Sequence, residues 1–223
     1  MPRPEAVVFD LDGTLIHSAP ELLNAANTYL AGLDRAPLTL AELQGFIGNG
    51  VPTLVKRLRA ARALDTGPED IARFLGIYQN NPVGHTTVYP GVVAALQTLS
   101  LAGVPLGVCT NKPEKPTRDI LDHFGINRYF RTVVGGDTLP VHKPDPAPLR
   151  HAMQELASTS VLFVGDSEVD CATAQAAGQP FALFTEGYRK SPVQALRSSL
   201  VFDRYDGFAQ TVLRIVSPQA QRA

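Results

Sequence analysis

The chain has 223 residues, of which 44% are hydrophobic and 18% are charged, and its formal net charge is −1. This composition is typical of a folded globular protein, and the lack of a basic excess argues against nonspecific nucleic-acid binding. No apolar run is long enough to cross a membrane, and Cys109 and Cys171 are too few for a disulfide framework; we therefore expect a cytoplasmic protein with neither a membrane nor a nucleic-acid partner.

The first predicted element is a buried strand over residues 6–10, an apolar run that ends at Asp10. Asp12 follows two positions later, and in an extended chain such residues face the same side. Two carboxylates about 5 Å apart repel by roughly 3 kcal/mol at an effective dielectric constant of 20. A metal ion, a shared proton or separation by a turn at Gly13 would relieve that repulsion.

Residues 16–83 carry a helical pattern. Apolar residues recur at helical spacing, and three sequences are typical of the capping boxes that begin helices: Ser18 with Glu21, Thr39 with Glu42, and Thr66 with Glu69. We therefore expect an all-helical cap domain over 16–83, inserted into a discontinuous catalytic core formed by 1–15 and 84–223.

After this insertion, strand-like and helix-like segments alternate. The strands are expected at 104–110, 130–136, 160–166 and 180–184. The helices are expected at 91–102, 114–124 and 168–177, and the residue directly after each helix is glycine, which commonly ends helices. Such alternation indicates an α/β fold, in which a Rossmann-like parallel sheet is covered by helices on both faces.

Polar residues follow several of these strands. Thr110 and Asn111 end the second strand, Asp166 and Asp170 follow the fourth, and Lys143 lies in the loop between the third and fourth. The carboxyl ends of parallel strands meet at one edge of a sheet, where ligands bind. Carboxylates gathered there suit Mg²⁺, and the hydroxyl and the ammonium group suit phosphoryl oxygens.

Four motifs in order, "DLDGTL", "CTNK", "HKPDP" and "GDSEVD", resemble those of the haloacid dehalogenase-like hydrolase superfamily over nearly the whole chain. Within it, "FIGNGVPTLVKRL" and "GVPLGVCTNKP" are most similar to the phosphoglycolate phosphatase family. This resemblance implies that Asp10 attacks phosphorus to form an aspartyl-phosphate. Asp12 would protonate the leaving alkoxide and then deprotonate the attacking water, while Thr110, Asn111 and Lys143 would hold the phosphate.

The resemblance also implies a Mg²⁺ site. The ion would be held by the carboxylates of Asp10 and Asp166 and by the backbone carbonyl of Asp12, with Asp170 in the outer shell or bound through water. One departure stands beside these motifs: His17 occupies a position where family members commonly have aspartate.

The stretch Gly48-Asn49-Gly50 predicts a loop that opens a helix, whose free amides could receive a second negative group of a small substrate. Arg57 is the cation we expect to assist there, ahead of Lys56 and Arg59. Lys112, next to Thr110 and Asn111, is instead expected at the surface or outside the groups that touch phosphate.

These observations predict a Mg²⁺-dependent phosphatase that hydrolyses 2-phosphoglycolate, with a small phosphorylated metabolite as its partner and a monomeric or homodimeric state. Three alternatives remain open. The chain could act on another small phosphate ester (a sugar phosphate, a nucleotide or pyrophosphate), work as a β-phosphoglucomutase-like mutase, or sense a phosphate ligand without catalysis.

Overall fold

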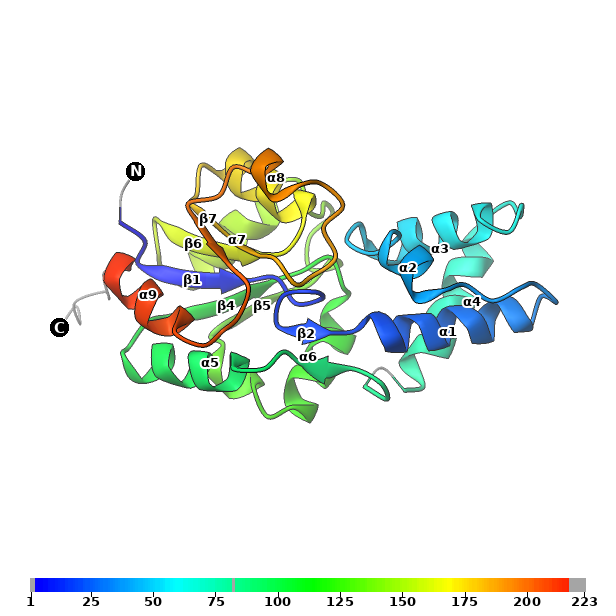
Figure 1. Cartoon of the computed structure of the whole chain (residues 1–223), viewed down its shortest axis with the longest axis horizontal. Coiled ribbons are helices and arrows are strands. Elements are labelled where there is room, and N and C mark those ends of the chain that lie inside the picture. Colours follow the sequence, from blue (N-terminus) through cyan, green and yellow to red (C-terminus); the bar gives the residue numbers. More distant parts are fainter. Residues whose placement is uncertain (1–2, 82, 217–223) are drawn as a thin grey trace.

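A computed structural model describes residues 3–81 and 83–216 of the chain. Within these residues the main sheet has six parallel strands in the order β5-β4-β1-β6-β7-β8 (Figure 1). The strands are β1 (Ala6–Phe9), β4 (Leu106–Cys109), β5 (Thr132–Val134), β6 (Val161–Gly165), β7 (Phe181–Phe184) and β8 (Leu200–Phe202). The five predicted strands are confirmed with slightly shorter bounds, and β8 is an additional edge strand.

Helices cover both faces of this sheet, as the sequence predicts. Alternate residues of β1 face opposite sides, so Val7 and Phe9 join one hydrophobic cluster while Ala6 and Val8 join another. The first cluster includes residues of α5 (Val92–Leu101), α6 (Glu114–His123) and α9 (Phe208–Ile215), and the second includes residues of α7 (Ala147–Glu155) and α8 (Glu168–Ala177). Short 3₁₀ turns lie at η1 (Asn127–Tyr129) and η2 (Val193–Ala195).

Four helices lie together beyond one end of the sheet (Figure 1). They are α1 (Ala19–Ala31), α2 (Leu40–Gln44), α3 (Gly50–Ala60) and α4 (Pro68–Gln79), and we call residues 19–79 the helical segment. It has its own hydrophobic cluster, which includes Tyr29 and Phe74 and also receives Tyr188 from the loop after β7. The chain enters through β2 (Ile16–His17) and returns through β3 (Thr87–Val88), which pair antiparallel. None of the helices in the described ranges combines the length and hydrophobicity needed to span a bilayer.

One of the three predicted capping boxes is confirmed. The Thr39 hydroxyl accepts from the Glu42 amide, and the Glu42 carboxylate accepts from the Thr39 amide. The prediction at Ser18 was wrong, because Ser18 makes no capping bond and Glu21 instead accepts from His85.

The prediction at Thr66 was also wrong. Helix α4 begins one residue later, after Gly67, whose amide donates to the Asp70 carboxylate. Helix α1 nevertheless begins directly after Ser18, so only the start of α4 is displaced.

Candidate functional site

The carboxyl ends of the central strands bring together residues that are far apart in the chain. Asp10 follows β1, Thr110 follows β4 and Asp166 follows β6, and β1 lies between the other two strands. The chain adds β4 and β5 on one side of β1 and then crosses back to add β6, so the site lies where the strand order reverses.

Three buried carboxylates form the centre of this site. Each contributes one carboxylate oxygen to a group whose three oxygens all lie within 4.8 Å of one another: Asp10, Asp166 and Asp170. The Lys143 ammonium lies 2.8 Å from Asp10 Oδ1 and 2.6 Å from Asp170 Oδ1, and its side chain is 2% exposed. One ammonium thus faces three acids, which leaves two negative charges uncompensated when all three are ionised. A divalent cation fits this charge and this set of oxygen donors.

Asp166 is fixed by its neighbours. Its Oδ1 accepts from the Thr14 hydroxyl at 3.0 Å, and its Oδ2 accepts from the Tyr188 amide at 2.5 Å. Glycine is required on two sides of this carboxylate: a Cβ built on Gly13 would lie 2.5 Å from Asp166 Oδ2, and one on Gly187 would lie 2.3 Å from it. The chain therefore packs tightly around the acid and fixes its orientation.

Burial and like charge raise the proton affinity of the cluster. Burial is the main cause that raises the pKa of Asp10 to about 7, with Asp170 adding to it and Lys143 opposing it. Burial, followed by Asp170 and Asp10, also raises the pKa of Asp166 well above its ordinary value. Burial alone would lower the pKa of Lys143, but the neighbouring Asp10 and Asp170 raise it above the ordinary value. A cation bound here would replace protons on the acids.

The side chain of Asn111 holds the loop that carries Lys143. Its Oδ1 accepts from the Lys143 backbone amide at 2.9 Å, and its Nδ2 donates to the Lys143 carbonyl at 2.9 Å and to the Gly48 carbonyl at 3.1 Å. Asn111 thus positions Lys143 and also links the sheet edge to the helical segment. The neighbouring Thr110 is buried, and its hydroxyl accepts from the Lys112 amide.

Asp12 lies beside a second buried ammonium group. The Nζ of Lys112 is 3.0 Å from Asp12 Oδ1, in an ion pair whose orientation falls outside that of a hydrogen bond. The same Nζ lies 4.9 Å from the centroid of the Tyr78 ring on α4. The Lys112 side chain is 4% exposed, so of the two positions expected for it the surface is excluded. Only its adjacency to Thr110 and Asn111 in the chain signalled a role in the site.

Two adjoining cavities open beside these residues, and Asp10 and Asp12 line both. The first also has walls from the helical segment, and its lining comprises Asp10, Asp12, Leu22, Ile47, Gly48, Gly50, Val51, Leu54, Tyr78, Thr110, Asn111 and Lys112. The second extends past Asn49 to Asp166, Asp170 and Lys190.

The predicted loop before α3 therefore lines the site, with Gly50 as the first residue of that helix and Asn49 before it. Arg57 is placed differently from Gly48, Asn49 and Gly50. Its guanidinium donates to the Phe46 carbonyl at 3.0 Å, and it is not among the residues that line either cavity.

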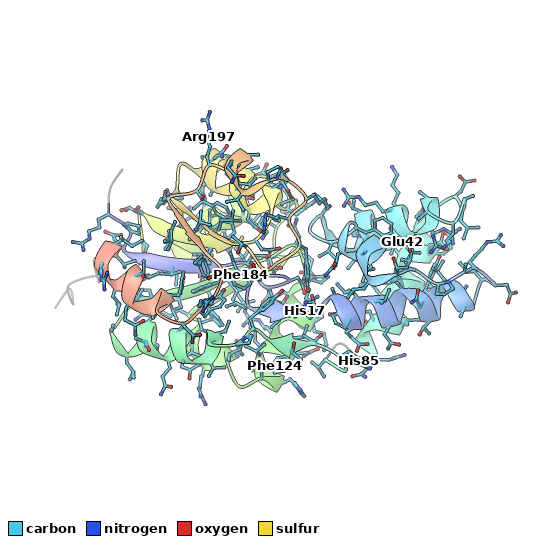
Figure 2. All side chains as sticks on the ribbon, in the orientation of Figure 1. His17, Glu42, His85, Phe124, Phe184 and Arg197 are labelled. Carbon is cyan, nitrogen blue, oxygen red and sulfur yellow. The ribbon has the colours of Figure 1, made fainter. Side chains whose placement is uncertain are left out.

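His17 lies at the junction between the sheet and α1 (Figure 2). Its Nδ1 is 3.0 Å from the Tyr188 hydroxyl, which also accepts from the Ala19 amide. Burial lowers the pKa of His17 below its ordinary value. His17 thus connects the start of the helical segment to Tyr188, whose amide donates to Asp166.

Residues 7–184 match the family model described as haloacid dehalogenase-like hydrolase. The chain belongs to that family. This haloacid dehalogenase-like hydrolase is 49% identical over 215 residues to a phosphoglycolate phosphatase of Cereibacter sphaeroides, an alignment that covers 95% of this chain and 99% of the relative. It is 46% identical over 212 residues to a phosphoglycolate phosphatase of Rhodospirillum rubrum, covering 91% and 88% of the two chains.

A solved structure supports the same membership. The crystal structure of a predicted phosphoglycolate phosphatase from Haemophilus somnus 129PT superposes on this hydrolase with a TM-score of 0.88 and 30% sequence identity. The superposition covers 95% of this chain and 99% of that one, so both the sheet and the helical segment have counterparts there.

Proposed function

We propose that this hydrolase is a Mg²⁺-dependent phosphatase that converts 2-phosphoglycolate to glycolate and phosphate. The observation that carries the proposal is the buried group of Asp10, Asp166, Asp170 and Lys143 at the carboxyl edge of the sheet. The substrate follows from the name phosphoglycolate phosphatase carried by relatives 49% and 46% identical over most of the chain.

Asp10 is the proposed nucleophile. Lys143 holds its Oδ1, whereas its Oδ2 accepts no hydrogen bond from any residue within the described ranges. In the first step a carboxylate oxygen of Asp10 forms a bond to phosphorus, the bond from phosphorus to the ester oxygen breaks, and Asp12 gives that oxygen its proton. In the second step Asp12 takes a proton from water, whose oxygen attacks phosphorus, and Asp10 leaves with its carboxylate restored.

Mg²⁺ would be held by the carboxylates of Asp10 and Asp166 and by the backbone carbonyl of Asp12. Asp170 is a poorer direct ligand, because the Lys143 ammonium lies 2.6 Å from its Oδ1 and both the hydroxyl and the amide of Ser167 donate to its Oδ2. Each oxygen of Asp166 accepts one hydrogen bond from a neutral donor and keeps a lone pair for a cation. When bound, the ion would supply positive charge that offsets the acids and a phosphate oxygen. Lys143 and Thr110 would hold the remaining phosphoryl oxygens.

The helical segment supports a further part of the proposal. Residues 16–83 would act as a cap over a core made of 1–15 and 84–223, since Gly48 and Tyr78 line the same cavity as Asp10. Closure of this cap would keep water from the reacting phosphate during transfer.

The test is phosphate release from a panel of small phosphate esters, with excess Mg²⁺ and with a chelator, for the native chain and for Asp10→Asn. We expect phosphoglycolate to give the highest kcat/KM, no turnover in the chelator, and loss of turnover in Asp10→Asn. Preference for a sugar phosphate, a nucleotide or pyrophosphate would reassign the substrate. Retention of phosphate with a bisphosphate activator would indicate a mutase, and tight binding without turnover would indicate a sensor.

A further inference from the structure

Lys112 and Tyr78 form a polar pair that the proposed phosphoryl-transfer steps do not use. Both line the cavity that also contains Asp10 and Thr110. Lys112 comes from the loop after β4, Tyr78 comes from α4, and the Nζ of Lys112 lies 4.9 Å from the centre of the Tyr78 ring. The pair therefore spans the boundary between the sheet edge and the helical segment.

Each member of this pair has unused capacity for hydrogen bonds. Within the described part of the chain no hydrogen bond of good geometry reaches the buried Tyr78 hydroxyl, and the neighbouring group that interacts with it is the Lys112 ammonium. The Lys112 ammonium can donate three hydrogen bonds, and its ion-pair partner there is Asp12. A ligand in the cavity could satisfy both groups.

A second ammonium beside Asp12 is not needed to hold the phosphate. Lys143 already contacts Asp10, the proposed nucleophile, whereas Lys112 contacts Asp12, the proposed proton donor. Asp12 has to reach the ester oxygen of the substrate. In phosphoglycolate the carboxylate carbon is two bonds from that oxygen, so the carboxylate must lie close to Asp12. The Nζ of Lys112 lies 3.0 Å from Asp12 Oδ1 and is therefore close to the expected position of the carboxylate.

We propose that the Lys112 ammonium and the Tyr78 hydroxyl bind the carboxylate of the substrate and thereby select short phosphate esters that carry one. This inference rests on the proposed function, because it assigns the specificity of that same site. The aliphatic side chains of the cavity wall are those of Leu22, Ile47, Val51 and Leu54. A neutral substituent would leave the buried ammonium without its anionic partner, which is the basis of strong discrimination against such analogues.

The structure disfavours Arg57 for this task. Its guanidinium is held by the Phe46 carbonyl, and it lines neither cavity. Binding of the carboxylate by Lys112 and binding by Arg57 are therefore alternatives, and the substrate preference of the two variants distinguishes them.

The experiment compares kcat/KM for 2-phosphoglycolate with that for 2-hydroxyethyl phosphate, in which a hydroxymethyl group replaces the carboxylate. The ratio of the two values measures carboxylate recognition. We expect Lys112→Met to lower this ratio about 100-fold, equivalent to about 2.7 kcal/mol, and Tyr78→Phe to lower it about tenfold. Lys115→Met, which removes an exposed lysine on α6, should leave the ratio unchanged.

An alternative role for Lys112, the positioning of Asp12, predicts a different result. If Lys112 only positions Asp12, Lys112→Met would slow both substrates equally and leave the ratio intact, which would overturn the proposal. A fall of the ratio in Arg57→Met instead would also overturn it. Thermal melts establish that each variant folds; if Lys112→Met does not, Lys112→Gln together with Tyr78→Phe carries the same test.

The native chain separates the two levels of inference. If it prefers an ester without a carboxylate, the proposed substrate fails, and the role of Lys112 fails with it. If it prefers phosphoglycolate while the ratio is unmoved in both the Lys112 and the Tyr78 variants, only the specificity assignment fails.

Discussion

The Lys143 ammonium lies 2.8 Å from Asp10 Oδ1, although 133 positions separate the two residues in the chain. The contact exists because β1 occupies the middle of the sheet and the loop before α7 returns to the carboxyl end of that strand. Asn111 fixes the loop by bonding to both the amide and the carbonyl of Lys143. Asn111, at the end of the neighbouring strand β4, therefore positions the Lys143 ammonium at the centre of the site.

Removal of the Lys143 ammonium should lower both the activity and the stability of the enzyme. In Lys143→Met we expect kcat to fall at least about 100-fold, because a buried charge that faces the phosphoryl group is lost. The free energy of unfolding in a chelator at pH 8 should fall by about 3 kcal/mol, since the partner acids stay buried without their ammonium. Phosphate release and urea titration measure the two effects. A fully active variant would contradict the role assigned to Lys143.

Asp10→Asn should separate activity from stability. Burial raises the pKa of Asp10 to about 7, so without metal its ionisation at pH 8 opposes folding. The neutral amide removes that cost, and a tenfold change in proton affinity is worth about 1.4 kcal/mol. We expect the variant to lose hydrolysis while unfolding at a higher temperature than the native chain in a chelator at pH 8. The gain should shrink at pH 5, where native Asp10 is largely protonated. A variant less stable at pH 8 would contradict this account.

The sequence predicted the sheet well and the helical segment less well. The strands were recognisable because each is a short apolar run closed by polar or glycine residues, and the parallel order follows from their alternation with helices. Edge strand β8 was not predicted, because it has only three residues, of which Leu200 and Phe202 are partly buried and Val201 is exposed. The capping box at Ser18 failed because Glu21 accepts from His85 instead, although helix α1 does begin after Ser18. The box at Thr66 failed because α4 begins after Gly67, whose amide donates to Asp70.

For the site, the sequence pattern predicted where the acids lie but not the position of the second buried lysine, Lys112. Asp10, Asp166 and Asp170 follow strands whose ends must meet, so their proximity could be predicted. Lys112 could not be assigned, because its burial depends on α4 folding back to place Tyr78 against it. Arg57 looked suitable by position on its helix, but the Phe46 carbonyl that holds it is set by the turn before α3.

Mg²⁺ should stabilise the chain more at pH 8 than at pH 5. The pKa values of Asp10 and Asp166 are raised by burial, so the stability that comes from their protonation is complete below the ordinary carboxyl pKa. That stability is lost as the pH rises through about 7, the value for Asp10. The ion binds the ionised acids, and therefore offsets the loss mainly at high pH.

Thermal melts with and without Mg²⁺ across this range measure the effect. Asp166→Asn provides the control, since it should abolish most of the increase at pH 8. An equal shift at pH 5 and pH 8 would mean that the ion binds elsewhere.

Two glycine substitutions should test how tightly the chain packs around Asp166. Gly13 and Gly103 both have positive φ, at 89° and 77°, so alanine strains the backbone at either position. A Cβ at Gly13 would lie 2.5 Å from Asp166 Oδ2, whereas one at Gly103 would meet nothing within 4 Å. Gly103→Ala should therefore cost about 1 kcal/mol of stability and leave kcat/KM unchanged.

Gly13→Ala should carry a similar backbone cost and, in addition, push the Asp166 carboxylate from its place. A displacement near 1 Å can reduce catalysis about 100-fold, and we expect a loss of that order in kcat/KM together with weaker activation by Mg²⁺. Steady-state kinetics over a Mg²⁺ titration, run beside Gly103→Ala, distinguish displacement of Asp166 from general destabilisation. Equal kinetics in the two variants would show that the carboxylate tolerates movement, and that the close approach at Gly13 does not set its position.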